Sequence, residues 1–292
     1  MKLITISGPP SSGKTSVILK LVESLREGGM EKIGAVKFDC LTSFDQVRYR
    51  EAGIPVEIGF SGKVCPDHFF ISNIEDAVKW GVKSGFDMLI TESAGLCNRC
   101  SPHISEIPAV CVIDSLSGIN TPRKIGPMLK FADYVVITKG DIVSQAEREV
   151  FKFNVRQVNT SARILFVNGI TGQGAFMLAK HLSRAVDITT LSDMHLRFTT
   201  PASVCSYCTG ETRIGEEFQN GMMKKMTFSP CDVYIKESGT ADAAGTPEKI
   251  RETANSAGAP EGVREAADFN VTDGARGTAN RQEKNEERGG RF

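Results

Sequence analysis

Hydrophobic residues in the first two thirds of the chain form short continuous runs that alternate with segments of helical spacing. Short apolar runs bounded by turn residues are typical of buried strands, whereas apolar residues three and four positions apart indicate amphipathic helices. We therefore expect strands at residues 2–7, 32–38, 85–92, 109–113, 134–137 and 164–167. We expect helices over residues 17–25, 46–52, 74–83, 122–131, 144–158 and 175–182. This alternation predicts an α/β fold.

The first predicted strand ends in a glycine-rich loop. Gly8 is followed, after four residues, by Gly13, Lys14 and Thr15, which is the spacing of a P-loop. In a P-loop, backbone N–H groups surround phosphate oxygens, the lysine adds positive charge at the β- and γ-phosphates, and the hydroxyl binds Mg²⁺. A chance glycine-rich turn is disfavoured because strand, loop and helix follow in register. We expect a three-layer P-loop NTPase with a mostly parallel sheet, and the expected phosphate-binding residues are Gly8, Pro9, Pro10, Ser11, Ser12, Gly13, Lys14, Thr15 and Ser16.

Two acidic residues follow predicted strands. Asp39 is placed to reach Mg²⁺ directly or through water, with Asp45 as the second choice. Asp45 and Ser43 suit a helix N-cap equally well. Glu92 is expected to orient the Mg²⁺-bound water, and Gly95 to let the backbone approach the γ-phosphate. The predicted catalytic residues are Lys14, Thr15, Asp39 and Glu92, of which the last three form the predicted Mg²⁺ site.

The strand at 134–137 ends in Thr138-Lys139-Gly140-Asp141. This pattern is typical of the guanine-reading element of GTPases, with Thr138 in place of the usual asparagine. The Asp141 carboxylate would accept from the guanine N1–H and amino group, and the stem of Lys139 would pack on the base. A polar turn is the alternative, but the preceding P-loop favours GTP as the nucleotide.

Cysteines recur in two loops of this region. Cys65 and His68 flank Pro66-Asp67, close enough to share Zn²⁺ or Ni²⁺, with Asp67 as a possible third ligand. Cys97 and Cys100 have the C-x₂-C spacing that suits chelation of one metal ion. These two cysteines lie in the loop that follows Glu92, so a change of nucleotide state could change the geometry of the metal ligands. The alternatives are loops whose cysteines and histidine bind no metal.

A second C-x₂-C pair, Cys205 and Cys208, lies beyond residue 190, and Cys231 follows. These three thiols suit a zinc site or an iron–sulfur cluster, either of which usually needs about four ligands. The fourth ligand could come from His195, from the Cys97 loop or from a second subunit. A β-hairpin module without metal is the alternative.

Composition argues against several other classes of protein, namely nucleic-acid-binding, membrane-spanning and secreted proteins. The 35 basic and 35 acidic residues balance, so no global charge attracts nucleic acid or anionic lipid. No run approaches the roughly 18 apolar residues of a membrane span, and no signal peptide opens the chain, so we expect a cytoplasmic protein. Residues 238–292 contain only two aromatic residues, Phe269 and Phe292, cannot bury enough apolar surface to offset their ordering entropy, and are expected to be largely disordered. We expect a GTPase domain at 1–187, a cysteine-containing extension at 188–237 and a tail at 238–292.

The motifs together resemble the HypB, UreG and CobW type of P-loop GTPase, which serves nickel insertion and metallocentre assembly. The resemblance covers roughly residues 1–185 and includes G-P-P-S-S-G-K-T, G-K-V-C-P-D-H, T-E-S-A-G-L-C-N-R-C and T-K-G-D. It implies GTP-gated homodimerisation, a metal held at the subunit interface, and a client metalloenzyme or its assembly factors as partner. By position, Cys65 matches the family's metal cysteine and His68 lies close to its histidine.

The favoured function is a GTP-hydrolysing metallochaperone. A nucleotide-gated iron–sulfur or redox protein is one alternative, in which the two C-x₂-C pairs hold the cluster. An ATP-dependent small-molecule kinase is the other.

Overall fold

The computed structural model describes residues 1–97, 99–199, 210–219 and 221–231. Among these residues, seven parallel strands form one sheet in the order β3-β2-β4-β1-β5-β6-β7. The strands are β1 (Lys2–Ser7), β2 (Ile33–Asp39), β3 (Val56–Phe60), β4 (Met88–Ser93), β5 (Ala109–Asp114), β6 (Tyr134–Thr138) and β7 (Arg163–Phe166). The expected α/β fold with a mostly parallel sheet is confirmed.

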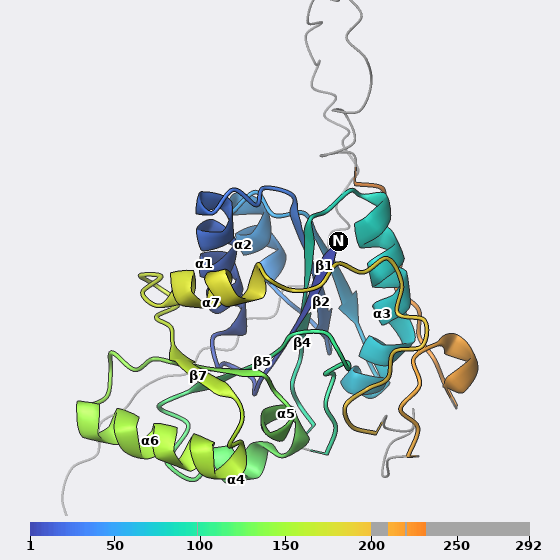
Figure 1. The fold of residues 1–292 in the computed structure, drawn as a ribbon. Coiled ribbons are helices and arrows are strands. Elements are labelled where there is room, and N and C mark those ends of the chain that lie inside the picture. Colours follow the sequence, from blue (N-terminus) through green and yellow to red (C-terminus); the bar gives the residue numbers. More distant parts are fainter. Residues whose placement is uncertain (98, 200–209, 220, 232–292) are drawn as a thin grey trace, which may run out of the picture. The chain divides into compact units, whose positions relative to one another are not determined.

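Helices cover both faces of the sheet (Figure 1). The helices are α1 (Lys14–Glu27), α2 (Asp45–Glu51), α3 (Pro66–Lys83), α4 (Pro122–Ile125), α5 (Pro127–Lys130), α6 (Gln145–Val158) and α7 (Ala175–Leu182), with a 3₁₀ turn, η1, at Glu216–Phe218. Helices α1, α2 and α7 pack with the side chains of one sheet face, among them Ile4, Ile6 and Val112. Helices α3 to α6 cover the other face, which presents Leu3 and Cys111. The domain therefore has three layers.

Three elements differ from the sequence expectation. Strand β3 was not expected, because this short edge strand carries Glu57 and Gly59 within its apolar run. Helix α3 begins at Pro66, not at residue 74, since proline suits the first helical position. The helix expected at 122–131 is two short helices, because Gly126 has φ 70° and ψ −140° and Pro127 supplies no N–H there.

The described residues after 187 share the core of the P-loop domain. Ile188, Leu191, Leu196 and Ile214 join the apolar cluster beneath α3. Residues 222–231, here called the strap, lie along α3: the Asn73 amide donates to the carbonyl of Lys224 at 2.8 Å, and the Trp80 indole donates to that of Ser229 at 2.8 Å. The described residues of the cysteine-containing extension expected at 188–237 therefore pack closely against the domain expected at 1–187.

The tail at 238–292 and the pair Cys205 and Cys208 lie outside the described residues. Among the described residues, no helix combines the length and apolarity that crossing a lipid bilayer requires.

Candidate functional site

The P-loop lies between β1 and α1. Gly13 precedes α1 with a φ of 90°, and no side chain caps the first turn, so the helix N-terminus presents its backbone N–H groups. This arrangement favours a bound phosphate, because the helix dipole adds partial positive charge. The Lys14 ammonium donates to the carbonyls of Gly8 and Pro9 at 2.9 and 3.0 Å, and burial lowers the pKa of Lys14 although the nearby Glu92 charge opposes this effect.

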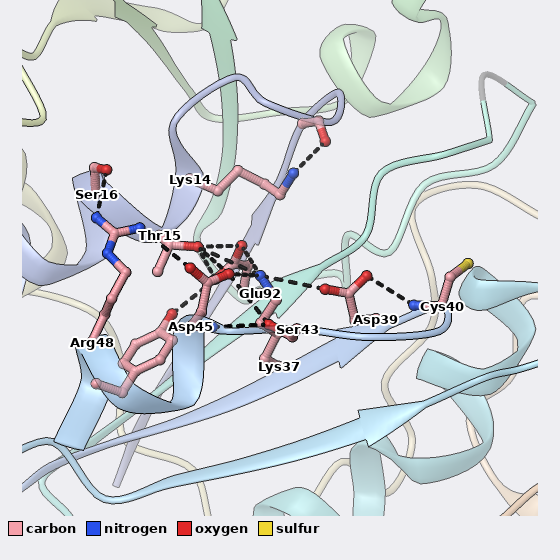
Figure 2. Close-up of polar contacts among 12 residues, drawn as sticks. Lys14, Thr15, Ser16, Lys37, Asp39, Cys40, Ser43, Asp45, Arg48 and Glu92 are labelled. Carbon is pink, nitrogen blue, oxygen red and sulfur yellow. Dashed lines mark hydrogen bonds and ion pairs between the residues drawn. The ribbon is translucent and has the colours of Figure 1, made fainter. Parts of the chain in front are cut away.

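Beside Lys14, a cluster of oxygen atoms converges on Thr15 (Figure 2). The Thr15 hydroxyl lies 2.9 and 3.0 Å from the two carboxylate oxygens of Glu92 and 3.2 Å from Asp45 Oδ2. Hydroxyl and carboxylate oxygens are the ligands that Mg²⁺ prefers, so these three residues fit the ion that accompanies a nucleoside triphosphate.

The order of the two candidate aspartates is the reverse of the sequence expectation. Asp45, at the first position of α2, contacts the Thr15 hydroxyl. Asp39 instead accepts from the backbone N–H of Cys40 at 2.8 Å and lies 3.5 Å from the Lys37 ammonium. Asp45 is therefore the closer candidate for Mg²⁺, and Asp39 lies beside it on the far side of the Lys37 ammonium.

Two side chains that contact the carboxylates of the candidate site were not singled out from the sequence. The Lys37 ammonium lies 2.6 Å from Asp45 Oδ2 and 2.9 Å from Glu92 Oε1, and the fully buried Tyr49 hydroxyl donates to Glu92 Oε2 at 2.8 Å. Burial opposes the charge of Lys37, but Glu92 and Asp45 outweigh it and raise its pKa above the ordinary value. The one signal in the sequence that could have pointed to Lys37 was a lysine within an otherwise apolar strand.

The loop after β4 approaches the P-loop at Gly95. Gly95 has φ 66°, and a Cβ added there would lie 1.8 Å from the carbonyl oxygen of Gly8. Only glycine allows this contact between the two backbones. Any change at the P-loop that moves Gly8 therefore acts directly on the loop that follows Glu92.

The element Thr138–Asp141 lies on the other side of the P-loop. Thr138 donates to the Ser12 carbonyl at 2.6 Å and Lys139 donates to the Ser11 carbonyl at 2.9 Å, so threonine ties this element to the P-loop. Next to it is a cavity of about 260 Å³, which is lined by Gly13, Ser16, Thr138, Lys139, Asp141, Ile142, Asn168, Gly169 and Ile170. A larger groove of about 710 Å³ between α1 and α2 borders neither Lys14 nor Thr15. Of these two, only the smaller cavity borders Asp141, and a neighbouring cavity of about 280 Å³ borders Asp141 from the side of Gly140 and Arg148.

A group of potential transition-metal ligands lies at the start of α3. One ligand atom each from Asp67, Cys97 and Cys100 lies within 4.8 Å of the others. The two sulfur atoms are 3.5 Å apart, and the backbone N–H of Arg99 donates to the Cys97 sulfur. Asp67 Oδ2 is buried and has no hydrogen-bond partner among the residues that the structure describes, and burial raises the pKa of Asp67 to about 7. Two thiols and a carboxylate suit a cation such as Zn²⁺.

The other expected metal ligands are placed differently. Cys65 is the N-cap residue of α3 and His68 lies in its first turn, buried, and neither belongs to the group around Asp67. Successive helical residues point about 100° apart, so Asp67 and His68 face different directions. Cys231 packs against the apolar cluster beneath α3 and joins no ligand group among the described residues.

The fold and the glycine-rich loop define a P-loop nucleotide-binding protein. The chain belongs to the CobW/HypB/UreG family, whose nucleotide-binding domain matches residues 2–166.

Individual relatives were found as well. The chain is 46% identical over 226 residues to Uncharacterized protein MJ0120 of Methanocaldococcus jannaschii, a match covering 77% of this chain and 96% of that protein. It is 28% identical over 200 residues to Urease accessory protein UreG 2 of Bradyrhizobium sp., covering 63% of this chain and 90% of that protein. Among solved structures, hydrogenase maturation factor HypB from Archaeoglobus fulgidus matches with a TM-score of 0.49 and 23% identity, covering 62% of this chain and 88% of that one.

Proposed function

We propose that this protein is a GTP-binding and GTP-hydrolysing metallochaperone or metallocentre-assembly protein, in which nucleotide state controls the binding and release of a transition metal. One observation carries the proposal. Gly95 contacts the P-loop backbone at Gly8, and Cys97, two residues later, belongs to the group of potential metal ligands. A loop that contacts the phosphate-binding loop at one end and carries metal ligands at the other would couple nucleotide state to metal binding.

At the phosphate end, Lys14 and the amide groups of the P-loop would bind the β- and γ-phosphates. Thr15, Asp45 and Glu92 would hold Mg²⁺, which neutralises phosphate charge when it is bound, with Asp39 beside them. The Glu92 carboxylate, fixed by Tyr49 and Lys37, is the group we assign to orienting the attacking water.

At the base end, we assign guanine recognition to Asp141. We expect Asp141→Asn to lower GTP affinity about thirtyfold, because the carboxylate that accepts two hydrogen bonds is replaced by an amide. Xanthosine triphosphate, which has a carbonyl where guanine has its amino group, should bind the variant better than the wild type. Calorimetric titration with GTP, ATP and xanthosine triphosphate tests this, with the exposed Asp193→Asn as control. Tight ATP binding unaffected by Asp141→Asn would favour the small-molecule kinase instead.

At the metal end, Asp67, Cys97 and Cys100 would bind the metal cargo as Zn²⁺ or Ni²⁺, with Cys65 and His68 nearby in sequence. We expect Cys97→Ser to weaken Zn²⁺ binding about thirtyfold, because a thiolate ligand is lost. Cys231→Ser is the matched control and should leave Zn²⁺ affinity unchanged. The titration is run with GDP and with a non-hydrolysable GTP analogue. Equal Zn²⁺ affinities in the two nucleotide states would contradict the coupling of nucleotide state to metal binding.

The same preparation addresses the remaining parts of the proposal. We assign the protein to the cytoplasm, where thiols stay reduced, with a nucleotide-dependent homodimer as the acting form and a client metalloenzyme or its assembly factor as partner. Anaerobic purification yielding a brown protein with stoichiometric iron and sulfide would favour the cluster-carrying alternative, in which Cys205 and Cys208 also serve as ligands.

A further inference from the structure

Lys37 lies among the oxygen atoms that suit a divalent cation. Its side chain is 8% exposed, and its ammonium is 2.6 Å from Asp45 Oδ2 and 2.9 Å from Glu92 Oε1. The same nitrogen lies 3.5 Å from the Thr15 hydroxyl and 3.5 Å from Asp39 Oδ2. Figure 2 shows the ammonium surrounded by these four side chains.

The sheet holds Lys37 in this place. Strands β2 and β4 are parallel neighbours, and their register pairs Lys37 directly with Glu92. Side chains paired across neighbouring strands lie on the same face of the sheet, so the two are kept close. Because β2 is an interior strand, its backbone cannot carry the lysine away from the site without breaking the sheet.

Opposite charges face one another within a small volume around Lys37. Three carboxylates, those of Asp39, Asp45 and Glu92, face the ammonium, while Arg48 reaches Asp45 Oδ1 from the exposed side at 3.2 Å. A divalent cation bound to Asp45 and Glu92 would lie within a few ångströms of a like charge, and that repulsion is strong where water is largely excluded.

We propose that Lys37 competes with the divalent cation for Asp45 and Glu92 and so makes cation binding at this site depend on the nucleotide. This inference rests on the proposed function. Without nucleotide, the ammonium offsets part of the negative charge of Asp45 and Glu92, so a divalent cation gains less by binding there. Nucleoside triphosphate brings its own negative charge, which attracts both cations and allows both to be held.

Manganese binding without nucleotide tests this proposal directly, with Mn²⁺ as the probe and its electron paramagnetic resonance signal as the readout. We expect Lys37→Met to bind one Mn²⁺ about tenfold more tightly than the wild type, because the competing charge is gone. Lys83→Met is the control: Lys83 ends α3 just before β4 begins, is exposed, and should leave Mn²⁺ binding unchanged. Equal or weaker binding by Lys37→Met would overturn the proposal.

A second variant keeps the proposal testable if Lys37→Met fails to fold, since that substitution removes a positive charge from beside three carboxylates. The double variant Lys37→Met with Asp39→Asn removes one charge of each sign and keeps Asp45 and Glu92. It should also bind Mn²⁺ more tightly than the wild type, whereas Asp39→Asn alone should not. GTP binding by the wild type is measured separately in the presence of Mg²⁺. Failure of the wild type to bind GTP would contradict the proposed function, whereas unchanged Mn²⁺ binding in both Lys37 variants would contradict the competition alone.

Discussion

Replacing Gly95 by alanine is expected to lower nucleotide affinity at least about a hundredfold. A Cβ at this position would lie 1.8 Å from the carbonyl oxygen of Gly8 and 2.6 Å from its carbonyl carbon, well inside any van der Waals contact. Both atoms belong to backbone, so no side-chain rotation relieves the clash. The P-loop or the loop after β4 must move by more than an ångström, and misplacement on that scale disrupts a phosphate site.

The matched control is Gly53→Ala. Gly53 has nearly the same backbone conformation, φ 62° against 66° for Gly95, but a Cβ there meets nothing within 4 Å. Its substitution should cost only the strain of a left-handed residue, about 1 to 2 kcal/mol of stability, and leave GTP affinity unchanged. GTP titration and thermal unfolding of the two variants separate strain from clash. Equal GTP affinity in Gly95→Ala and Gly53→Ala would contradict the backbone contact.

Much of the fold follows from local sequence patterns. Several elements occur at the residues where apolar runs, helical spacing of apolar residues or the glycine-rich motif predicted them: the strands β1, β5 and β6, the helix α7 and the P-loop. Buried parallel strands are continuous apolar runs, and this signal needs no knowledge of distant residues. Strand β3 was not predicted, because Glu57 and Gly59 interrupt the apolar run of this strand at the edge of the sheet.

The candidate site was less accessible to sequence reasoning, because its contacts depend on register. Lys37 and Glu92 are far apart in the chain and meet only because β2 and β4 are neighbours with that pairing. Tyr49 reaches Glu92 from α2, and nothing local marks it as different from a core tyrosine. A lysine in an apolar strand could have been singled out, but its partners could not.

The ligand group at α3 depends on helix geometry. Once α3 is known to begin at Pro66, Asp67 and His68 must point in different directions, and only Asp67 joins Cys97 and Cys100. The segment after residue 187 then supports both ligand-bearing elements: the strap lies along α3, and Leu196 pairs with Ile104 in the loop that follows Cys100. The described residues of this segment are therefore placed to influence the candidate metal ligands through their contacts with α3 and with this loop.

Acidification is expected to destabilise the protein through His103, which is fully buried between β1 and α5. Its Nε2 lies 2.9 Å from the Met128 carbonyl oxygen, which can only accept, so Nε2 carries the hydrogen. Burial lowers the pKa of His103 to about 4, against an ordinary value of 6.5. The unfolded chain therefore binds a proton between these values that the folded protein does not, and stability falls as the pH drops.

The shift of His103 corresponds to about 3 kcal/mol, lost progressively between about pH 7 and pH 4. His103→Gln keeps an amide donor for Met128 and cannot titrate, so its unfolding free energy lacks this contribution. Urea unfolding across that range should show the wild type losing about 3 kcal/mol relative to His103→Gln, because all other titrating groups cancel in the difference. A constant difference between the wild type and His103→Gln across this range would mean that His103 protonates without cost in the folded protein.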